Sequence, residues 1–496
     1  MLGSHKPQTN ILSVKNRQHN RTRLVLPHDE LPAEEPRCEQ PVEAPDNKTL
    51  PASPKLIHSK PLHVVGFTSL LSRYRRRPAV KCDCGRQLES PGLRFEGIKH
   101  LLMIVLFLGS LRLLWIDSQI KGIRYAFRKA GFQSKDMKYC ILLLAMNLVY
   151  LPIALIVERI AATSCNPNKQ ESKLSQCRCK MVTAVHILNA STCLIGSSLF
   201  CYQFIWNPLI GTICESNTII TFFKLTSYCL TNTALRENHH LGTSGPEYYG
   251  SVRYPNNLTA RNAVYFWFAP TLIYQPVYPR TERIRWQVFW SLVGETLVGL
   301  IFIWMLSLKL AAPILNDTMI HYETGSLQLV DDFIKLCAVN ITIWLLGFFV
   351  IFQSVLNLLA EITRFADRDF YRDWWNAGCL GTYWRDWNKP ISNFLRRHVY
   401  YPLRSRKVGN LAASIIVFFI SAVFHELLVG VATKNFNGVA FFSMMAQVPL
   451  IKLTEPLEKI RGPGTTIGNC IFWLSILLGQ PTGLIIYYVS WSLKHK

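Results

Sequence analysis

Apolar residues gather in runs of about twenty positions along most of the chain, and polar or charged segments separate these runs. As a helix, a run of this length crosses the roughly 30 Å hydrocarbon core of a bilayer. The pattern predicts about nine transmembrane helices, near residues 100–115, 139–158, 182–206, 209–228, 286–311, 334–360, 408–433, 438–453 and 466–492. The expected fold is therefore an all-α polytopic membrane protein.

The first 98 residues contain no apolar run near spanning length. They are rich in Pro, Asn, His, Lys and Arg, a composition typical of a largely disordered tail. No hydrophobic stretch with a cleavage site opens the chain, so we do not expect a secretory signal peptide. We therefore divide the chain into an N-terminal tail, residues 1–98, and a transmembrane domain, residues 99–496.

Composition agrees with a membrane protein and excludes a soluble enzyme. The 496 residues are 49% hydrophobic and only 17% charged, whereas a soluble domain carries about a quarter charged residues. The net charge of +23 does not indicate nucleic acid, because no DNA- or RNA-binding motif accompanies it. The pairs Cys82/Cys84 and Cys177/Cys179 are spaced too closely for structural zinc, so we expect no metal.

Charge in the loops predicts the orientation of the chain. The segment 362–407 contains ten Lys and Arg against four Asp, which favours the cytosolic side and puts the N-terminus there too. The segment 117–138 is also basic, yet this topology places it on the lumenal side, which contradicts the rule that basic loops lie in the cytosol. On that opposite, lumenal side, between the fifth and sixth predicted spans, Asn316 begins the one glycosylation sequon that this orientation places plainly in the lumen. The ionisable residues Arg112, Glu295 and His425 lie within spans and should face the bundle interior.

The stretch 369–402 is unusually rich in aromatic residues, Arg and Asp. One interpretation is an amphipathic helix at the bilayer surface, where aromatic side chains and Arg are common. The other is a binding site for a ligand with a flat base, several phosphates and an apolar tail. Aromatic rings stack on a base and Arg holds phosphates, so coenzyme A esters fit this composition.

His425 lies inside an apolar run and is followed by Glu426. Such a histidine can be structural, bonded across helices, or it can act as a general base. A zinc site of the HExxH type is excluded, because Val429 stands where the second His would be. Two further amides, Gln447 and Gln480, precede prolines that should break or kink their helices. They either line a polar pocket or bond helices together.

The sequence FYRDWWN resembles the FYxDWWN signature of sterol and diacylglycerol acyltransferases in the membrane-bound O-acyltransferase superfamily. Its matching residues are Phe370, Tyr371, Asp373, Trp374, Trp375 and Asn376. Residues 254–275, the Trp387-Asn388-Lys389-Pro390 turn, MMAQVPL at 444–450 and GQP at 479–481 resemble the type-1 diacylglycerol branch more than the sterol enzymes. The resemblance implies transfer of a fatty acyl group from acyl-CoA to diacylglycerol.

Matched residue by residue, the resemblance implies that His425 is the catalytic base and that Asn388 assists it. It implies substrate-binding roles for Trp387, Tyr400, Glu426, Met444, Gln447 and Gln480. Ser392 and Asn410 depart from the His and Lys common in the family, which puts individual coenzyme A contacts in doubt. The resemblance further implies the endoplasmic reticulum membrane, a homo-oligomer (dimer or tetramer) and no cofactor, since acyl-CoA is a substrate.

Two rival functions stay open. A sterol or long-chain alcohol acyltransferase would use the same chemistry with a different acceptor pocket. A non-catalytic lipid carrier would bind membrane lipids without transferring an acyl group. The reaction product formed from labelled acyl-CoA and each acceptor distinguishes these possibilities.

Overall fold

The computed structural model describes residues 133–163, 173–240, 252, 254–460 and 463–495. Within these ranges the regular structure is helical, apart from one antiparallel bridge between Arg280 and Phe365. Six helical segments have the length and hydropathy to cross a membrane: Ser134–Thr163, Lys180–Phe204, Trp286–Thr324, Gln328–Ile362, Asn410–Thr433 and Thr465–Lys494. The all-α, multi-pass class is confirmed. The expected tail, the span at 100–115 and Arg112 lie outside the described residues.

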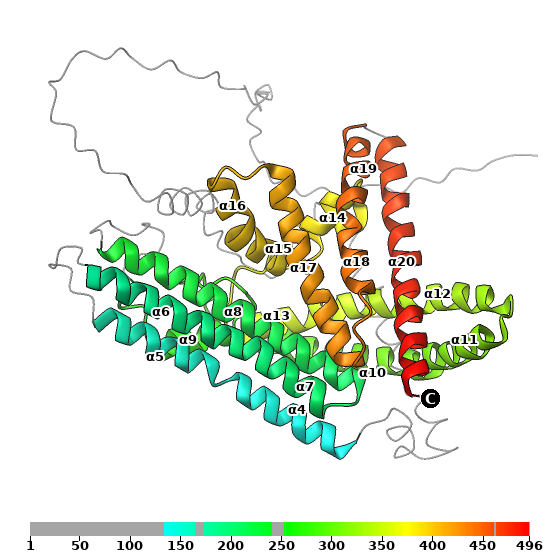
Figure 1. Cartoon of the computed structure of the whole chain (residues 1–496), viewed down its shortest axis with the longest axis horizontal. Helices are drawn as coiled ribbons and strands as arrows, with labels where there is room; N and C mark the ends of the chain where they lie inside the picture. Colours follow the sequence, from blue (N-terminus) through cyan, green and yellow to red (C-terminus); the bar gives the residue numbers. More distant parts are fainter. Residues whose placement is uncertain (1–132, 164–172, 241–251, 253, 461–462, 496) are drawn as a thin grey trace, which may run out of the picture. The chain divides into compact units, whose positions relative to one another are not determined.

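The N-terminal half of the described chain consists mainly of long helices, joined by shorter helical segments (Figure 1). They are α4 (Ser134–Asn147), α5 (Tyr150–Thr163), α6 (Lys173–Ser191), η1 (Thr192–Gly196), α7 (Ser197–Phe204), α8 (Pro208–His240) and the short α9 (Ala260–Phe268). Next come α10 (Trp286–Leu306), η3 (Ser307–Ala311), α11 (Ala312–Thr324), α12 (Gln328–Phe348), η4 (Phe349–Val355) and α13 (Leu356–Ile362). The segments η1, η3 and η4 are π-helical turns within longer helices.

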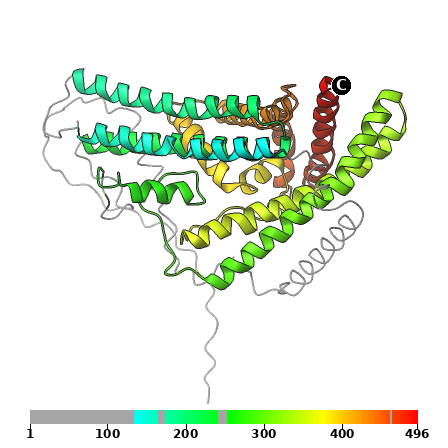
Figure 2. The same cartoon turned by 90° about the horizontal axis from the view of Figure 1, so that it is seen from below.

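The segment between α13 and α17 folds into five short helices. These are η5 (Trp374–Asn376), α14 (Leu380–Asp386), α15 (Lys389–Leu395), η6 (Arg396–Tyr400) and α16 (Tyr401–Ser405). The last elements are α17 (Asn410–Thr433), α18 (Val439–Met445), α19 (Gln447–Lys459) and α20 (Pro463–His495). In Figure 2 the helices α10 and α12 run alongside each other, and they are in contact. The stretch 369–402, for which a single amphipathic surface helix was one of two interpretations, is thus a folded loop of several short helices.

Helix α8 has buried polar positions along its length, which is why its hydropathy is too low for a candidate span. These positions include Glu215, Thr218, Lys224, Ser227 and Arg236. Arg236 and His186 of α6 both contact the carboxylate of Glu158 on α5, at 2.5 and 3.0 Å. The three helices are therefore held together by a buried ionic cluster as well as by apolar packing.

Prolines affect the last helices in two ways. A new helix, α19, begins at Gln447 just before Pro449, so the predicted break of the 438–453 run is observed. Proline is tolerated in a first helical turn, where the missing N–H has no intrahelical partner. By contrast, α20 continues as a helix through Pro481, so this proline does not break it. Glu295 behaves as expected of a charge inside a span, since it is buried and accepts a hydrogen bond from Ser354.

Candidate active site

His425 lies in the second half of α17 with its imidazole half-buried. Its Nδ1 is 2.7 Å from the backbone carbonyl oxygen of Ser421, one helical turn earlier, and 3.5 Å from the Ser421 hydroxyl. A carbonyl oxygen can only accept, so Nδ1 carries the proton and donates it. In the neutral ring this leaves the lone pair on Nε2. The helix backbone thus holds the imidazole in the tautomer that a base requires.

Glu426 points to a different set of partners. Its Oε1 accepts a hydrogen bond from the backbone N–H of Gly438 at 2.9 Å, and its Oε2 accepts from the N–H of Phe441 at 3.1 Å. The hydroxyl of Tyr487 on α20 donates to Oε2 at 2.8 Å. A carboxylate at the start of α18 also matches the positive end of that helix dipole. Glu426 therefore ties α17, α18 and α20 together beside His425.

The predicted pocket amides each have a partner on another helix or loop. The side-chain oxygen of Gln480 accepts a hydrogen bond from Nδ2 of Asn340 on α12 at 3.1 Å. Gln447 accepts from the indole N–H of Trp384 at 3.3 Å. Because the Gln480 oxygen is engaged in this way, the N–H end of its amide is the end available to a ligand. Met444 is buried in α18.

The FYRDWWN motif forms a corner in which Phe370, Tyr371 and Trp374 point inward. Phe370 and Trp374 are each only 2% exposed. The hydroxyl of Tyr371 donates to the side-chain oxygen of Gln353 in η4 at 2.7 Å. Asp373, Trp375 and Asn376 stay exposed at the surface of the corner. Three residues of the motif, Phe370, Tyr371 and Trp374, therefore pack inward, whereas the other four face outward.

The Trp387-Asn388 pair lies beside this corner. The Trp387 ring stacks on Tyr383, with centroids 5.9 Å apart and an interplanar angle of 13°. The Asn388 side-chain oxygen accepts from the N–H of Ile391 and caps α15, so its amide N–H groups point away from the helix. The backbone N–H of Lys389 donates to the carbonyl of Phe370 at 3.0 Å, which holds the pair against the motif.

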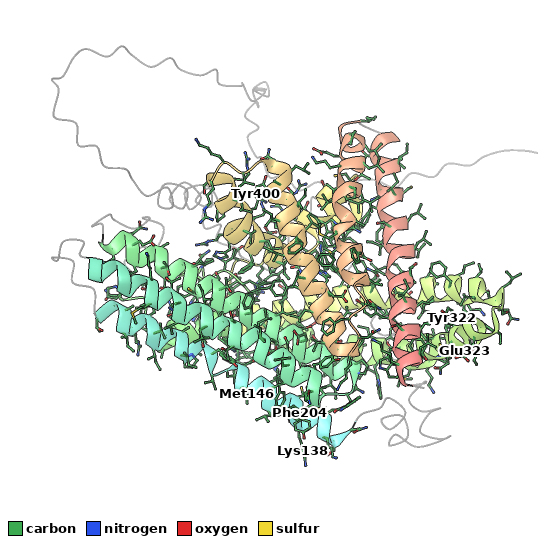
Figure 3. The ribbon with its side chains drawn as sticks, viewed as in Figure 1. Lys138, Met146, Phe204, Tyr322, Glu323 and Tyr400 are labelled. Atoms are coloured by element: carbon green, nitrogen blue, oxygen red, sulfur yellow. The ribbon has the colours of Figure 1, made fainter. Side chains whose placement is uncertain are left out.

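Tyr400 stands apart from the aromatic cluster that surrounds Trp387. It belongs to η6, and Figure 3 labels it among the short helices of the 362–407 loop. Its ring contacts Tyr401, with centroids 5.7 Å apart, and its hydroxyl lies 3.5 Å from the Asn410 side-chain oxygen. The neighbouring His398 contacts the hydroxyl of Ser227 on α8 at 2.9 Å. Loss of hydration on burial, together with the charge of Arg397, lowers the pKa of His398 to about 3.

Several residues that hold this region together were not predicted from the sequence. The ammonium of Lys224 donates to three backbone carbonyls at the end of α9, those of Phe266, Trp267 and Ala269, at 2.8 to 2.9 Å. Ser227 accepts from the N–H of Tyr274. The chain 254–279, which carries much of the sequence resemblance, is thereby fixed to α8. The only available signal was a polar residue at every third or fourth position of an apolar run.

Two negative results concern possible ligands. A cavity of about 40 Å³ lies between the 270–279 segment and Phe370, which is room for a few water molecules but not for coenzyme A. In the part of the chain that the structure describes, no three His, Cys, Asp or Glu side chains are grouped to hold a metal.

Comparison with known sequences identifies the class of protein. The profile of the membrane-bound O-acyltransferase family matches residues 200–490, and the chain belongs to this family. Among curated proteins it is similar to diacylglycerol O-acyltransferase 1 of Dictyostelium discoideum, with 31% identity over 82% of this chain and 64% of that protein. Diacylglycerol O-acyltransferase 1C of Glycine max is 33% identical over 84% of this chain and 80% of its own length. The protein named diacylglycerol O-acyltransferase 1 in Arabidopsis thaliana is 36% identical over 55% of this chain and 51% of its own length. The predicted family resemblance is confirmed.

Proposed function

We propose that the chain is an acyl-CoA:diacylglycerol O-acyltransferase that forms triacylglycerol. The observation that carries this proposal is the imidazole of His425, half-buried in a spanning helix and held with its lone pair on Nε2, in a chain of this family. The names of the relatives support diacylglycerol as the acceptor. The thioester is already an activated acyl donor, so the reaction needs no cofactor.

In the proposed reaction, Nε2 of His425 removes the proton from the free hydroxyl of diacylglycerol. The hydroxyl oxygen attacks the thioester carbonyl carbon and forms a tetrahedral intermediate with a negative oxygen. Collapse of this intermediate breaks the carbon–sulfur bond and releases the coenzyme A thiolate. The thiolate then accepts the proton from the imidazolium, which restores neutral His425. General base catalysis of this kind contributes about a hundred- to ten-thousand-fold to the rate.

The negative oxygen of the intermediate needs hydrogen-bond donors. Gln480 and Asn388 suit this role, because the oxygen of each amide is occupied and the N–H end is the one that remains for a ligand. We assign Trp387 and Tyr400 to the coenzyme A moiety, and Met444 and Gln447 to the substrate pocket. For Glu426, the three hydrogen bonds it accepts support a positioning role beside the base.

We also propose the membrane arrangement: nine spans in the endoplasmic reticulum membrane, with the N-terminus and the 362–407 loop in the cytosol. Contacts between the ends of the helices support the alternation of sides. Arg285 before α10 pairs with Glu361 at the end of α13, at 2.9 Å. These residues lie at one end of the two spans Trp286–Thr324 and Gln328–Ile362. At the other end of the same two spans, His321 of α11 pairs with Asp332 of α12. We further propose a homo-oligomer, dimer or tetramer, from the family resemblance.

The test is product identity. Microsomes containing the chain receive labelled oleoyl-CoA together with diacylglycerol, cholesterol or a long-chain alcohol, and the labelled lipids are separated by thin-layer chromatography. We expect label in triacylglycerol. Label in sterol esters or wax esters would show that the acceptor is a sterol or a long-chain alcohol instead of diacylglycerol. If no more label were transferred than in a His425→Ala control, the proposal that the chain is an acyltransferase would be rejected. Sealed microsomes should use added acyl-CoA without detergent, whereas activity only after permeabilisation would invert the proposed orientation.

A further inference from the structure

Asn469, near the start of α20, holds the end of the FYRDWWN motif and the residue that follows it. Its Nδ2 donates to the backbone carbonyl of Trp375 at 2.9 Å and to that of Ala377 at 3.0 Å. These carbonyls flank the end of η5, where the chain is irregular and offers them no helical partner. One amide group of α20 thus satisfies two carbonyls of the corner.

The preceding residue, Gly468, packs against the same corner at a different position, Gly378. A Cβ on Gly468 would lie 1.8 Å from the carbonyl oxygen of Gly378, and a Cβ on Gly378 would lie 2.9 Å from the Thr465 side chain. No larger residue fits at Gly468 unless one of the two backbones moves. The start of α20 and the corner therefore touch backbone to backbone, and this contact fixes the distance at which Asn469 donates.

Aromatic packing extends the contact along α20. Trp374 of the motif lies against Phe472 and Trp473, with ring centroids 6.2 and 5.8 Å apart. Tyr383 of α14 lies against Phe472 at 4.7 Å. The corner and the first turns of α20 therefore form one packed unit, and α20 also carries Gln480 about three turns further on.

The corner is in turn bonded to the region that we assign to the thioester end of the substrate. The N–H of Arg372 donates to the carbonyl of Asp386 at 2.8 Å, and the N–H of Lys389 donates to the carbonyl of Phe370. These two bonds lie on either side of Trp387 and Asn388 in the sequence. A shift of the corner away from α20 would thus carry the Trp387-Asn388 pair with it.

We propose that Asn469 is a positioning residue for acyl-CoA, which holds the FYRDWWN corner and, through it, the Trp387-Asn388 pair at a fixed place relative to α20. The proposal deepens the function proposed above and rests on it. Asn469 itself touches backbone carbonyls and has no part in the proton transfer. Its effect should fall on the KM for acyl-CoA through Trp387 and on kcat through Asn388, but not on the KM for diacylglycerol, because diacylglycerol is not bound by this loop in the proposed reaction.

The decisive variant is Asn469→Asp, which keeps the size of the side chain but replaces the N–H donors with oxygen opposite two carbonyl oxygens. Asn469→Ala removes the donors without adding a charge. Ser475→Ala is the matched control, because the Ser475 hydroxyl donates only to the carbonyl of Phe472 in its own helix at 2.8 Å. All three are purified as full-length protein, and initial rates are measured against acyl-CoA and against diacylglycerol.

For Asn469→Asp we expect the KM for acyl-CoA to rise about tenfold, the order expected when two hydrogen bonds are lost. The effect of Asn469→Ala should be smaller, since it introduces no repulsion. The KM for diacylglycerol and every constant of Ser475→Ala should stay within about twofold of the wild type. An unchanged KM for acyl-CoA in Asn469→Asp would overturn the proposal. Equal rises in both KM values would overturn it as well, because they would indicate a general loss of structure.

Two further measurements keep the inference separate from the proposed function. Binding of a non-hydrolysable acyl-CoA thioether needs no acceptor, and its Kd should rise in Asn469→Asp even if the wild type esterifies a sterol or another alcohol. Hydrogen exchange at residues 370–389, without substrate, should increase in Asn469→Ala and not in Ser475→Ala. Unchanged exchange would overturn the positioning role, whereas failure of diacylglycerol esterification alone would reject only the choice of acceptor.

Discussion

The hydroxyl of Tyr487 donates to Oε2 of Glu426 and also accepts the N–H of Ala440, so one tyrosine of α20 joins α17 to the first turn of α18. We expect Tyr487→Phe to lower the free energy of unfolding by about 1–3 kcal/mol, because it leaves a carboxyl oxygen and an N–H short of a partner. It should also slow acyl transfer, since Glu426 follows His425 directly. The measurement is the thermal midpoint in detergent together with kcat.

Tyr488→Phe is the control for this variant, because the Tyr488 hydroxyl donates to the neutral side-chain oxygen of Asn316 at the edge of the bundle. It should leave kcat near the wild-type value. If both tyrosine variants reduced kcat equally, the link between Glu426 and the base would be wrong.

His425→Ala should reduce acyl transfer by about a hundred- to ten-thousand-fold while the protein remains folded. The side chain is half-buried and its hydrogen-bond partner, Ser421, lies in the same helix, so its removal breaks no hydrogen bond between helices in the part of the chain that the structure describes. The measurement is transfer of label at matched expression, with the thermal midpoint as a check on folding. More than about a tenth of wild-type activity would exclude the general base role.

Trp387 and Tyr400 should respond differently to replacement by Ala. Tyr400→Ala should raise the KM for acyl-CoA and change the thermal midpoint little, because the aromatic contact described for its ring is with the adjacent Tyr401 and its hydroxyl bond to Asn410 is long, at 3.5 Å. Trp387→Ala should raise the same KM and also lower the midpoint, because it removes the stack on Tyr383 and contacts to Phe352 and Trp344. A rise in the KM for diacylglycerol in either variant would contradict the assignment to coenzyme A.

Gly299 predicts a compensating pair of mutations. A Cβ at this position of α10 would lie 2.3 Å from Cγ2 of Val350 in η4, and valine is stiff at this bond. Gly299→Ala should therefore destabilise by about 1–3 kcal/mol. The double variant Gly299→Ala/Val350→Ala should recover part of this loss, since the clashing methyl is gone. Additive losses in a double-mutant cycle would show that the close contact is not the cause.

The lowered pKa of His398 predicts a pH dependence of stability. An unfolded histidine binds a proton near pH 6.5, but the folded one does so only near pH 3. The unfolded state therefore binds more protons between these values, and stability falls as the pH is lowered through this window, by up to about 1.4 kcal/mol per pH unit. Thermal midpoints between pH 7 and 5 should fall less steeply for His398→Gln than for the wild type. If the thermal midpoints of His398→Gln and of the wild type fell equally with pH, His398 would not be the source of the pH dependence.

Six of the nine predicted spans correspond to candidate spanning helices, because a run of twenty apolar residues favours a membrane. The run 209–228 belongs to α8, which has buried polar residues, and 438–453 is divided between α18 and α19. The FYRDWWN motif led to the family, which is confirmed, whereas the catalytic role of His425 stays a prediction. The sequence did not reveal that Phe370 and Trp374 of the motif point inward, since an aromatic residue serves equally in a core or a binding surface. The contacts of Asn469 and Lys224 were hidden because their partners lie about 90 and 42 to 45 residues away in the chain.

The buried polar face of α8 has a consequence for how the chain is made. The translocon admits segments to the bilayer according to their hydrophobicity, and a Lys or Arg near a helix centre opposes this. The energetic cost of placing Lys224 and Arg236 in the membrane is offset only when their partners are already beside them. These partners are the carbonyls of α9 for Lys224 and the carboxylate of Glu158 for Arg236. We therefore expect α8 to enter the membrane late, after α5 is in place and after α9, which follows α8 in the chain, has been synthesised. An early pause in synthesis within α8 should leave this segment outside the lipid, while α5 is already embedded.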